Sequence, residues 1–134
     1  MKYWKFLDYV NQSGRNVIEH WLQELPTLAR IQINTRIQYL EITKQLGRPY
    51  IATLKGPCKG LIELRVKVKN VQYRPIACHG PNDGEITIIA GAIEKDGKFE
   101  PRDVCKTALE RKLQIFEEGR TDEHSFKEPQ TDSK

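Results

Sequence analysis

Cationic side chains are concentrated in one stretch of this chain, residues 44–74, where together they have the chemistry to bind phosphate. The stretch carries eight cations and one anion, so its formal charge is +7 in a chain of net charge +4, and the remaining residues sum to −3. The cations are Lys44, Arg48, Lys55, Lys59, Arg65, Lys67, Lys69 and Arg74, and the anion is Glu63. A concentrated basic band is the electrostatic footprint of a surface that binds nucleic acid. The alternative is a solvated surface that is basic but binds nothing. The charge distribution alone favours neither interpretation over the other.

Two arginines of this band, Arg65 and Arg74, are suited to hold one phosphate together. A guanidinium stays protonated and grips phosphate oxygens through a planar fork. Arg65 lies in residues 62–69, where apolar and charged side chains alternate, which predicts a strand with one dry and one charged face. A turn at residues 69–70 returns the chain and brings Arg74 beside Arg65, with Tyr73 on the opposite, buried face. This interpretation loses its basis if the two guanidiniums point in unrelated directions, or if both are closed into internal ion pairs.

The elements that must position these arginines begin with a strand and a helical hairpin. Residues 2–10 alternate aromatic or apolar with polar side chains and predict an opening strand. The polar run at residues 11–14 supplies capping side chains for a helix that ends at Pro26. Thr27 is predicted to cap a second helix, and Gly47 to stop it as the residue after its C-cap. Both helices are amphipathic, so their apolar stripes must be covered.

The apolar period then changes from helical to alternating, which predicts a sheet. Four segments read as strands, namely residues 51–54, 62–69, 71–78 and 85–93. Pro75 cannot donate to a ladder, so it indicates an edge or a bulge in the third of them. The run Gly80-Pro81-Asn82-Asp83-Gly84 predicts a turn before the last strand.

A final helix and a polar tail complete the predicted order. Pro101 is placed in the first turn of this helix, and Gly119 at its end. Its buried side is predicted to carry Cys105, Leu109, Leu113 and Phe116. From Arg120 the chain is polar, so we expect a folded domain over residues 1–119 and a disordered tail over 120–134. The expected fold class is α+β, with the strand and helical hairpin packed on a mostly antiparallel sheet of four or five strands and closed by the C-terminal helix.

Composition favours a single-domain cytoplasmic protein that binds no metal and no cofactor. The chain has 134 residues, of which 38% are hydrophobic and 30% charged, as is ordinary for a globular domain. It contains no apolar run long enough for a membrane span and no apolar N-terminal segment typical of a secretory signal. Its three cysteines, Cys58, Cys78 and Cys105, are widely spaced, which argues against a disulfide framework or a zinc site. We expect three separate thiols in a reducing compartment.

The basic band also carries a resemblance to a known family. Leu54-Lys55-Gly56 and the segment Gly60 to Arg65 are similar to the "LKG…GLxELR" stretch of RelE/HigB-type toxins, especially the phage-related branch of the RelE/ParE superfamily. Tyr73-Arg74 matches the "YR" of that family's next strand. Further matches are Gly91, Lys95, Pro101, Ala108 and Arg111. The resemblance covers about residues 1–118, and it fails where Ala90-Gly91-Ala92 replaces "HGF" and Glu94-Lys95 replaces a pair of lysines.

The resemblance implies the toxin component of a type II toxin–antitoxin system, a ribosome-dependent endoribonuclease (mRNA interferase) that inhibits translation. It implies metal-independent cleavage of mRNA, with Arg65 and Arg74 on the scissile phosphate and Lys95 as acid or base. Backbone phosphate contacts would come from Lys55, Lys59, Lys67 and Lys69. The implied partners are mRNA, the ribosome and a neutralising antitoxin protein, with no membrane and no metal.

Two other functions remain open from the sequence. The first is a binding protein on the same fold, either a ParE-like toxin that inhibits DNA gyrase or a phage relative that has lost catalysis. The departures at Ala92 and Glu94 favour this alternative, because they fall in the segment that would contribute to the catalytic face. The second is a generic basic nucleic-acid-binding domain.

Overall fold

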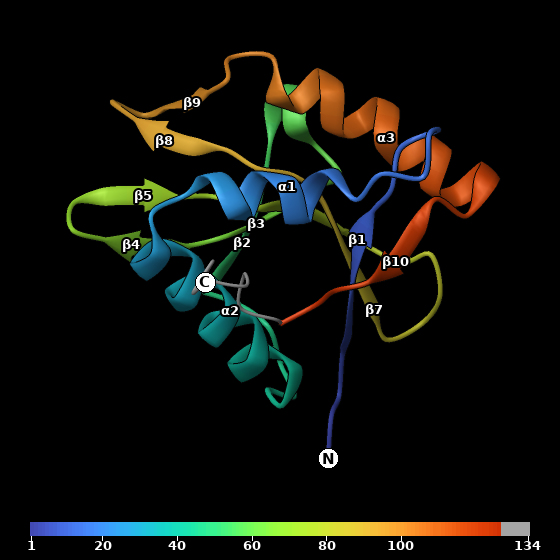
Figure 1. Cartoon of the computed structure of the whole chain (residues 1–134), viewed down its shortest axis with the longest axis horizontal. Coiled ribbons are helices and arrows are strands. Elements are labelled where there is room, and N and C mark those ends of the chain that lie inside the picture. Colours follow the sequence, from blue (N-terminus) through green and yellow to red (C-terminus); the bar gives the residue numbers. More distant parts are fainter. Residues whose placement is uncertain (127–134) are drawn as a thin grey trace, which may run out of the picture.

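The computed structural model describes residues 1–126 of the chain, and within that range it has an α+β fold of three α-helices and ten short strands (Figure 1). The helices are α1 (Val17–Glu24), α2 (Thr27–Glu41) and α3 (Val104–Glu118), with a 3-10 helix, η1, at Gly56–Cys58. The strands are β1 (Lys5–Tyr9), β2 (Ile51–Thr53), β3 (Ile62–Leu64), β4 (Val66–Val68), β5 (Val71–Tyr73), β6 (Ile76–His79), β7 (Glu85–Ala90), β8 (Ile93–Lys95), β9 (Lys98–Glu100) and β10 (Thr121–Glu123). The predicted fold class, with its N-terminal strand, helical hairpin and closing helix, is confirmed.

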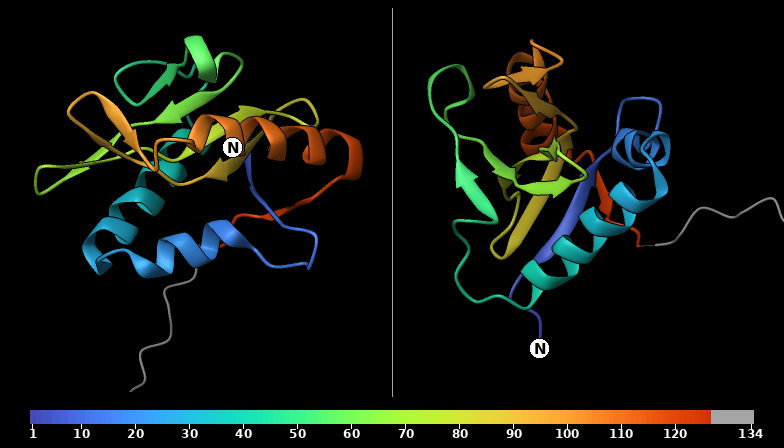
Figure 2. Two further views of the ribbon diagram at one scale, coloured as in Figure 1. Left: turned by 90° about the horizontal axis from the view of Figure 1, so that it is seen from above. Right: turned by 90° about the vertical axis from the view of Figure 1, so that its left-hand side faces the viewer.

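The strands form two sheets rather than one. The larger has the order β10-β1-β7-β6-β3-β2, and the smaller has the order β4-β5-β8-β9. Among the described pairs, β1 and β7 run parallel and all others antiparallel, so the prediction of mostly antiparallel pairing is confirmed. The hairpins β4–β5 and β8–β9 project from the same side of the molecule (Figure 1 and Figure 2). The sequence underestimated the number of strands because it did not predict that three long strands break, and because it did not predict β9 or β10.

These three breaks lie at one level of the sheet. One falls at Arg65 between β3 and β4, one at residues 74–75 between β5 and β6, and one at residues 91–92 between β7 and β8. The proline at position 75 explains the second, since it has no N–H to donate to a ladder. Arg74 N still donates to Ala92 O at 2.8 Å across the break. The breaks therefore mark a bend at which the smaller sheet turns away from the larger one, with backbone hydrogen bonding still present across it. Arg65 and Arg74 lie at this bend.

Helices cover both faces of the larger sheet. In Figure 1, α1 crosses in front of the strands, and the right panel of Figure 2 shows α1 and α2 together on one side of them. Ile18 and Ile33 pack there into one core with Leu64 of β3. On the other face, Ala108 and Ile115 of α3 pack into a second core. Burying each large aliphatic side chain contributes about 1.5–3 kcal/mol to the free energy of folding. The two cores therefore hold the larger sheet between α1 and α2 on one face and α3 on the other. Within residues 1–126, no helix is long and apolar enough to cross a membrane.

Several helix ends differ from the sequence-based prediction. Asn16, rather than the run at residues 11–14, caps α1 by accepting a hydrogen bond from Glu19 N at 2.8 Å. Pro26 occupies the N-cap of α2, so Thr27 is its first residue and not its cap. That helix ends at Glu41, well before Gly47.

The ends of α3 were predicted in part. Gly119 ends the helix in the left-handed conformation, at φ 66°, as expected for a C-terminal glycine. However, α3 begins at Val104, so Pro101 precedes its first turn. Leu113 and Phe116 are exposed, because α3 turns Ala108 and Ile115 toward the sheet instead.

The expectation of three separate thiols was wrong. Cys58 and Cys105 form a disulfide with a Cα–Cα distance of 4.9 Å, and only Cys78 is free. Their separation of 47 residues hid the pairing, which arises because η1 packs beside the first turn of α3. The bond therefore ties the loop between Lys55 and Lys59 to the closing helix. Cys78 is buried, and burial raises the pKa of its thiol to about 11.

The prediction of disorder from Arg120 onward was also wrong for the residues that the structure describes. Residues 121–123 form β10, which pairs antiparallel with β1 at the edge of the larger sheet. The side chain of His124 is buried, with Nδ1 2.7 Å from Asp8 Oδ1 and Nε2 2.8 Å from Asn34 Oδ1. Since Asp8 is itself 1% exposed, this histidine gives a buried carboxylate its partner. Residues 127–134 of the predicted tail lie outside the described residues.

Replacing this histidine should destabilise the whole domain. We expect His124→Ala to lower the free energy of unfolding by roughly 1–3 kcal/mol, because it leaves the buried Asp8 carboxylate without one of its hydrogen-bond partners. Glu123→Gln, on the exposed side of the same strand, should change it by less than about 0.5 kcal/mol. Urea unfolding followed by circular dichroism measures both. An unaltered midpoint for His124→Ala would show that residues 121–126 do not contribute to the fold.

Candidate functional site

The two arginines singled out in the sequence converge, but they converge on a carboxylate of the protein itself. Glu63 lies in β3, on the face opposite Leu64, and points into the bend of the sheet. Its Oε2 is 3.6 Å from Arg65 Nη1, and its Oε1 is 3.7 Å from Arg74 Nε. Both distances exceed a hydrogen bond. Glu63 therefore occupies the space between two guanidiniums where the sequence predicted a phosphate.

Arg74 is closed inside the protein. It is 1% exposed, and its Nε donates to Glu94 Oε1 at 3.1 Å. Its Nη1 donates to Tyr73 O at 3.1 Å, and its Nη2 donates to Gln72 Oε1. Gln72 and Glu94 face each other across β5 and β8, so both reach the same side of the sheet as Arg74. The prediction that Arg74 is presented outward to a phosphate was wrong, and its role is to hold Glu63 and Glu94 in place.

Arg65 differs from Arg74 because its guanidinium remains at the surface. Its side chain is 31% exposed, and its single ion pair among the described residues is the one with Glu63. The backbone beneath it is fixed, since Arg65 N donates to Tyr50 O at 2.8 Å and Arg36 Nη1 donates to Arg65 O at 2.6 Å. The Arg36 guanidinium also lies over the Tyr50 ring at 4.1 Å. A fixed backbone with a partly free guanidinium is suited to bind an anion from outside.

Glu63 is a residue whose functional potential the sequence did not reveal. Burial raises its pKa, and the nearby Arg74 and Arg65 only partly offset that effect, while Glu94 adds to it. A buried carboxylate with a raised pKa, beside a cation, has the properties of a general base. In the sequence, Glu63 stood out only as the single anion of the basic band. The sequence feature that could have indicated a functional role is a single acidic residue between apolar neighbours within a basic band.

Lys95 does not belong to this cluster. It follows Glu94 in β8, so its side chain lies on the opposite face of the smaller sheet. Its cross-strand neighbour is Lys98 of β9, and both lysines are exposed. Glu94, its neighbour in the sequence, pairs with Arg74. The structure thus separates Lys95 from both arginines, against the prediction that the three act together.

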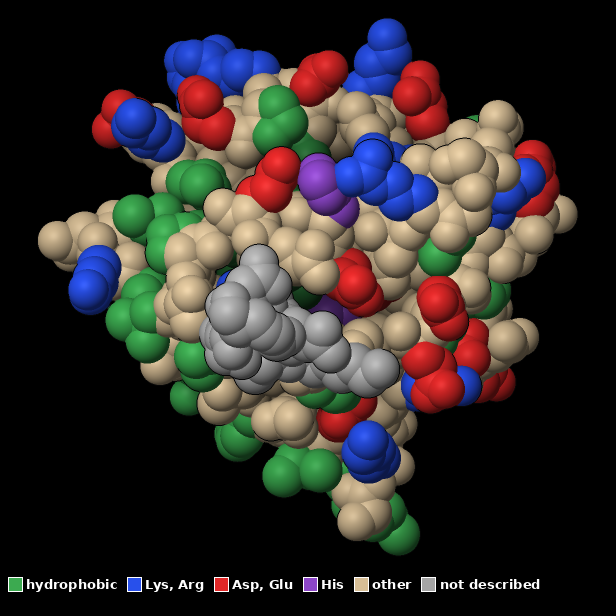
Figure 3. Space-filling model, in the orientation of Figure 1, with side chains coloured by type: hydrophobic (Ala, Val, Ile, Leu, Met, Phe, Trp, Pro, Cys, Tyr) green, Lys and Arg blue, Asp and Glu red, His purple; other side chains and the backbone are tan. Residues whose placement is uncertain are grey.

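The four lysines predicted to bind RNA are exposed and lie on two segments near the bend. Lys55 and Lys59 flank η1, and Lys67 and Lys69 belong to the β4–β5 hairpin. Lys67 pairs across the strands with Gln72, which places it on the same face as the arginine cluster. The side of the molecule that α1 crosses carries acidic and basic side chains together (Figure 3). Within the described chain, no group of three or more His, Cys, Asp or Glu could hold a metal ion.

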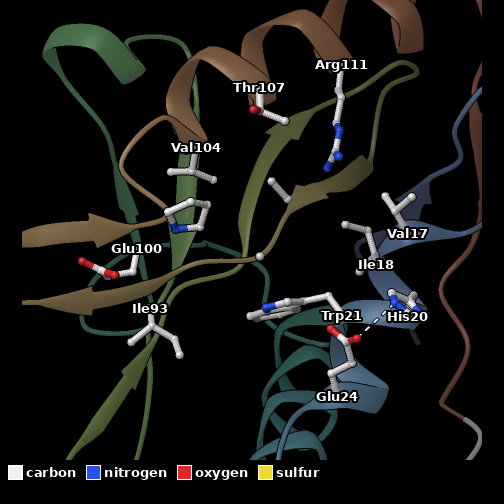
Figure 4. A pocket seen from close by; sticks show the side chains of 13 residues that line it. Val17, Ile18, His20, Trp21, Glu24, Ile93, Glu100, Val104, Thr107 and Arg111 are labelled. Atoms are coloured by element: carbon white, nitrogen blue, oxygen red, sulfur yellow. Dashed lines mark ion pairs between the residues drawn. The ribbon is translucent and has the colours of Figure 1, made fainter.

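A separate hollow of about 420 Å³ lies between α1, α3 and the break after β7 (Figure 4). Trp21 forms one wall, and Arg111 reaches down from α3, where its Nη1 donates to Ile89 O at 2.8 Å. Gly91 lies against the Trp21 ring so closely that a Cβ at this position would overlap it. The glycine that matched the toxin family is therefore required by packing, whereas its neighbour Ala92 is buried and has no polar group.

Gly91→Ala should lower the free energy of unfolding by about 1–3 kcal/mol, because its methyl group would overlap the Trp21 ring. Gly47→Ala is the matched control, since a Cβ there meets nothing within 4 Å. Thermal unfolding measures both. If the clash is the cause, Gly91→Ala should lower the free energy of unfolding much less in a protein that already carries Trp21→Ala. Equal costs in the two backgrounds would contradict this explanation.

The raised pKa of Glu63 predicts a pH dependence of stability with a defined sign. Because the folded state holds the Glu63 proton more tightly than the unfolded state, stability falls as pH rises above the ordinary glutamate pKa of about 4.3 and through the raised value. The unfolding free energy of the wild type minus that of Glu63→Gln should therefore fall with increasing pH. Urea titrations of both proteins from pH 4 to pH 8 measure this difference. A difference that grows with pH would mean that the arginines outweigh burial.

Comparison with known proteins identifies the family of the chain. Residues 20–113 match the family described as phage-derived protein Gp49-like (DUF891). The match extends from α1 into α3 and includes every residue of the arginine–glutamate cluster. No curated protein and no solved structure shows a significant match. Since the matched residues make up more than half of the chain, this protein belongs to the phage-derived Gp49-like family.

Proposed function

We propose that this protein is the toxin of a toxin–antitoxin pair and that it cleaves mRNA at the ribosome, as RelE/HigB-type toxins do. The observation that carries the proposal is Arg65, a partly exposed guanidinium on a fixed backbone beside a carboxylate of raised pKa. Membership in a phage-derived family and the "LKG…GLIELR" resemblance support the toxin assignment. The proposed location is the cytoplasm, where ribosomes and mRNA are found.

Arg65 and Glu63 together supply the two main requirements of RNA cleavage by the 2′-hydroxyl. Glu63 accepts the proton of the 2′-hydroxyl as its oxygen attacks the adjacent phosphorus. Arg65 then stabilises the charge that develops on the phosphorane oxygens. The bond to the 5′-oxygen breaks, that oxygen takes a proton from water, and Glu63 returns its proton to solvent. The products are a 2′,3′-cyclic phosphate and a 5′-hydroxyl, and no metal takes part.

In this mechanism Arg74 is a positioning residue rather than a catalytic one. Its contacts with Glu63 and Glu94 keep the Glu63 carboxylate turned toward Arg65. Lys55, Lys59, Lys67 and Lys69 would contact backbone phosphates on either side of the cleaved bond, each adding a modest, salt-dependent increment to affinity. A neutralising antitoxin would act by covering this basic surface or by displacing residues of the bend.

A second candidate function is a binding protein of the same fold that does not cleave RNA. Two observations favour it: Arg74 is fully engaged by the protein, and Lys95 lies on the opposite face from Arg65. Such a protein would inhibit a target such as DNA gyrase by occupying it. The two candidates differ in whether an RNA strand is cut.

The proposal is tested by programming ribosomes with a defined mRNA and mapping its 5′ ends by primer extension. We expect cuts in the ribosomal A site with the wild-type protein. Arg65→Ala should reduce the cleavage rate by about 10²–10³-fold, the cost of removing one donor to a developing oxyanion. Arg102→Ala removes a highly exposed arginine of the same chain and should leave the rate unchanged. Circular dichroism confirms that each variant is folded.

Other outcomes would reject the nuclease. Intact mRNA with wild-type protein, together with loss of gyrase supercoiling activity, would support the binding protein instead. Cleavage that persists in Arg65→Ala would show that this guanidinium does not hold the scissile phosphate. Arg65→Lys keeps the charge but lacks the planar fork, so we expect it to restore only part of the rate.

A further inference from the structure

The hollow between α1, α3 and the break after β7 contains a cation whose charge is not neutralised by the described residues. Arg111 extends from α3, and in Figure 4 its guanidinium points away from that helix into the hollow. Its Nη1 donates to Ile89 O at 2.8 Å, and its Cζ lies 5.0 Å from the centre of the Tyr9 ring. A carbonyl and a ring face carry no net charge. Among the described residues, no carboxylate forms an ion pair with this guanidinium.

The partial burial of Arg111 makes the missing counterion unfavourable. Burial lowers the pKa of its guanidinium, and the nearby Tyr9 only partly offsets that effect. The ordinary pKa of arginine is so high that the group nevertheless stays charged at neutral pH. Of its three nitrogens, only Nη1 has a hydrogen-bond partner among the described residues. The other donors are therefore available to an anion that enters the hollow.

The remaining walls of the hollow fit an apolar, flat group rather than a bare ion. The apolar side chains that line it are Val17, Ile18, Trp21, Ile93 and Val104. The Trp21 ring is held in place, because Gly91 lies directly against it. Sites for small organic ligands are mostly apolar, carry a few polar groups and measure roughly 300–1,000 Å³. The hollow, with about 420 Å³ and one guanidinium, has these properties.

Two carboxylates at the rim limit the charge that a ligand can carry. Glu24 and Glu100 also line the hollow, and their side chains are 66% and 57% exposed. Glu24 pairs with His20 Nε2 at 3.2 Å, and Glu100 lies 4.0 Å from Arg102 Nε. Because like charges repel, these carboxylates oppose a dianion such as a phosphate monoester more than they oppose a monoanion. The hollow therefore favours a ligand with a single negative charge.

We propose that this hollow binds a small aromatic carboxylate, with its carboxylate on Arg111 and its ring against Trp21. The carboxylate accepts two N–H bonds from the guanidinium and supplies the opposite charge that the described residues do not provide. The ring covers the apolar walls and removes them from water.

The ligand does not compete with RNA for the Glu63–Arg65 site. Ile93 lines the hollow, whereas the next residue, Glu94, pairs with Arg74 on the other face of β8. The proposal is therefore independent of the nuclease activity, and its test uses no RNA.

The test compares two probes of the same shape, 2-naphthoate and its neutral analogue 2-naphthamide, by isothermal titration calorimetry with the full chain. We expect 2-naphthoate to occupy one site with a dissociation constant below about 1 mM, and 2-naphthamide to bind roughly tenfold more weakly or worse. Arg111→Met keeps an unbranched side chain but removes the charge, so it should weaken 2-naphthoate by a similar factor and leave 2-naphthamide unchanged. Lys106→Met, the matched control, removes an exposed cation of the same helix and should change neither affinity.

Several outcomes overturn the proposal. They are the absence of saturable 2-naphthoate binding, equal affinity for the two probes, and wild-type affinity for 2-naphthoate in Arg111→Met. Equal losses in Lys106→Met and Arg111→Met also overturn it, because binding would then follow the overall charge. Tighter binding of 2-naphthyl phosphate than of 2-naphthoate would contradict the preference for a monoanion. Circular dichroism checks the fold of each variant, and if Arg111→Met does not fold, the two probes on the wild type decide.

Discussion

The central interaction of this structure is a carboxylate held between two guanidiniums where three strands break. Taking Glu63 out of water is unfavourable, and that cost raises its pKa even though Arg65 and Arg74 both lie within 3.7 Å of its oxygens. A carboxylate in such a place needs cations on both sides, and the bend of the sheet supplies them.

The two cations of this cluster are not equivalent, and the difference separates structure from chemistry. Arg74 uses its donors on Glu94, Gln72 and a backbone carbonyl, so it behaves as an internal cation that joins β5 to β8. Arg65 is anchored through its backbone while its guanidinium stays at the surface. One buried cation therefore fixes the acid, and one exposed cation is left to meet an anion. The exposed lysines of η1 and of the β4–β5 hairpin extend the same positive surface outward.

Local patterns in the sequence predicted the parts of the fold that depend on neighbouring residues. Alternation over residues 62–69 predicted that Ile62, Leu64 and Val66 are buried but missed the burial of Glu63. Lys69-Asn70 forms the expected tight turn, with positive φ at both residues. Contacts between distant segments were not predictable in this way. The Cys58–Cys105 bond and the strand β10 depend on how the sheet folds back on itself, and the closure of Arg74 depends on the strand register that sets Gln72 opposite Glu94. The sequence therefore predicted the two arginines as neighbours but not the carboxylate between them.

The most direct test of this account is to follow the side-chain Nε–H signals of both arginines by ¹⁵N NMR while a non-cleavable 2′-O-methyl RNA is added. We expect the Arg65 signal to shift with RNA concentration and reach saturation, because its guanidinium is open to an external phosphate. The Arg74 signal should stay in place and exchange slowly with water, since its Nε donates to Glu94 inside the protein. A shift of Arg74 equal to that of Arg65, or no shift of Arg65 at saturating RNA, would contradict the division of roles between them.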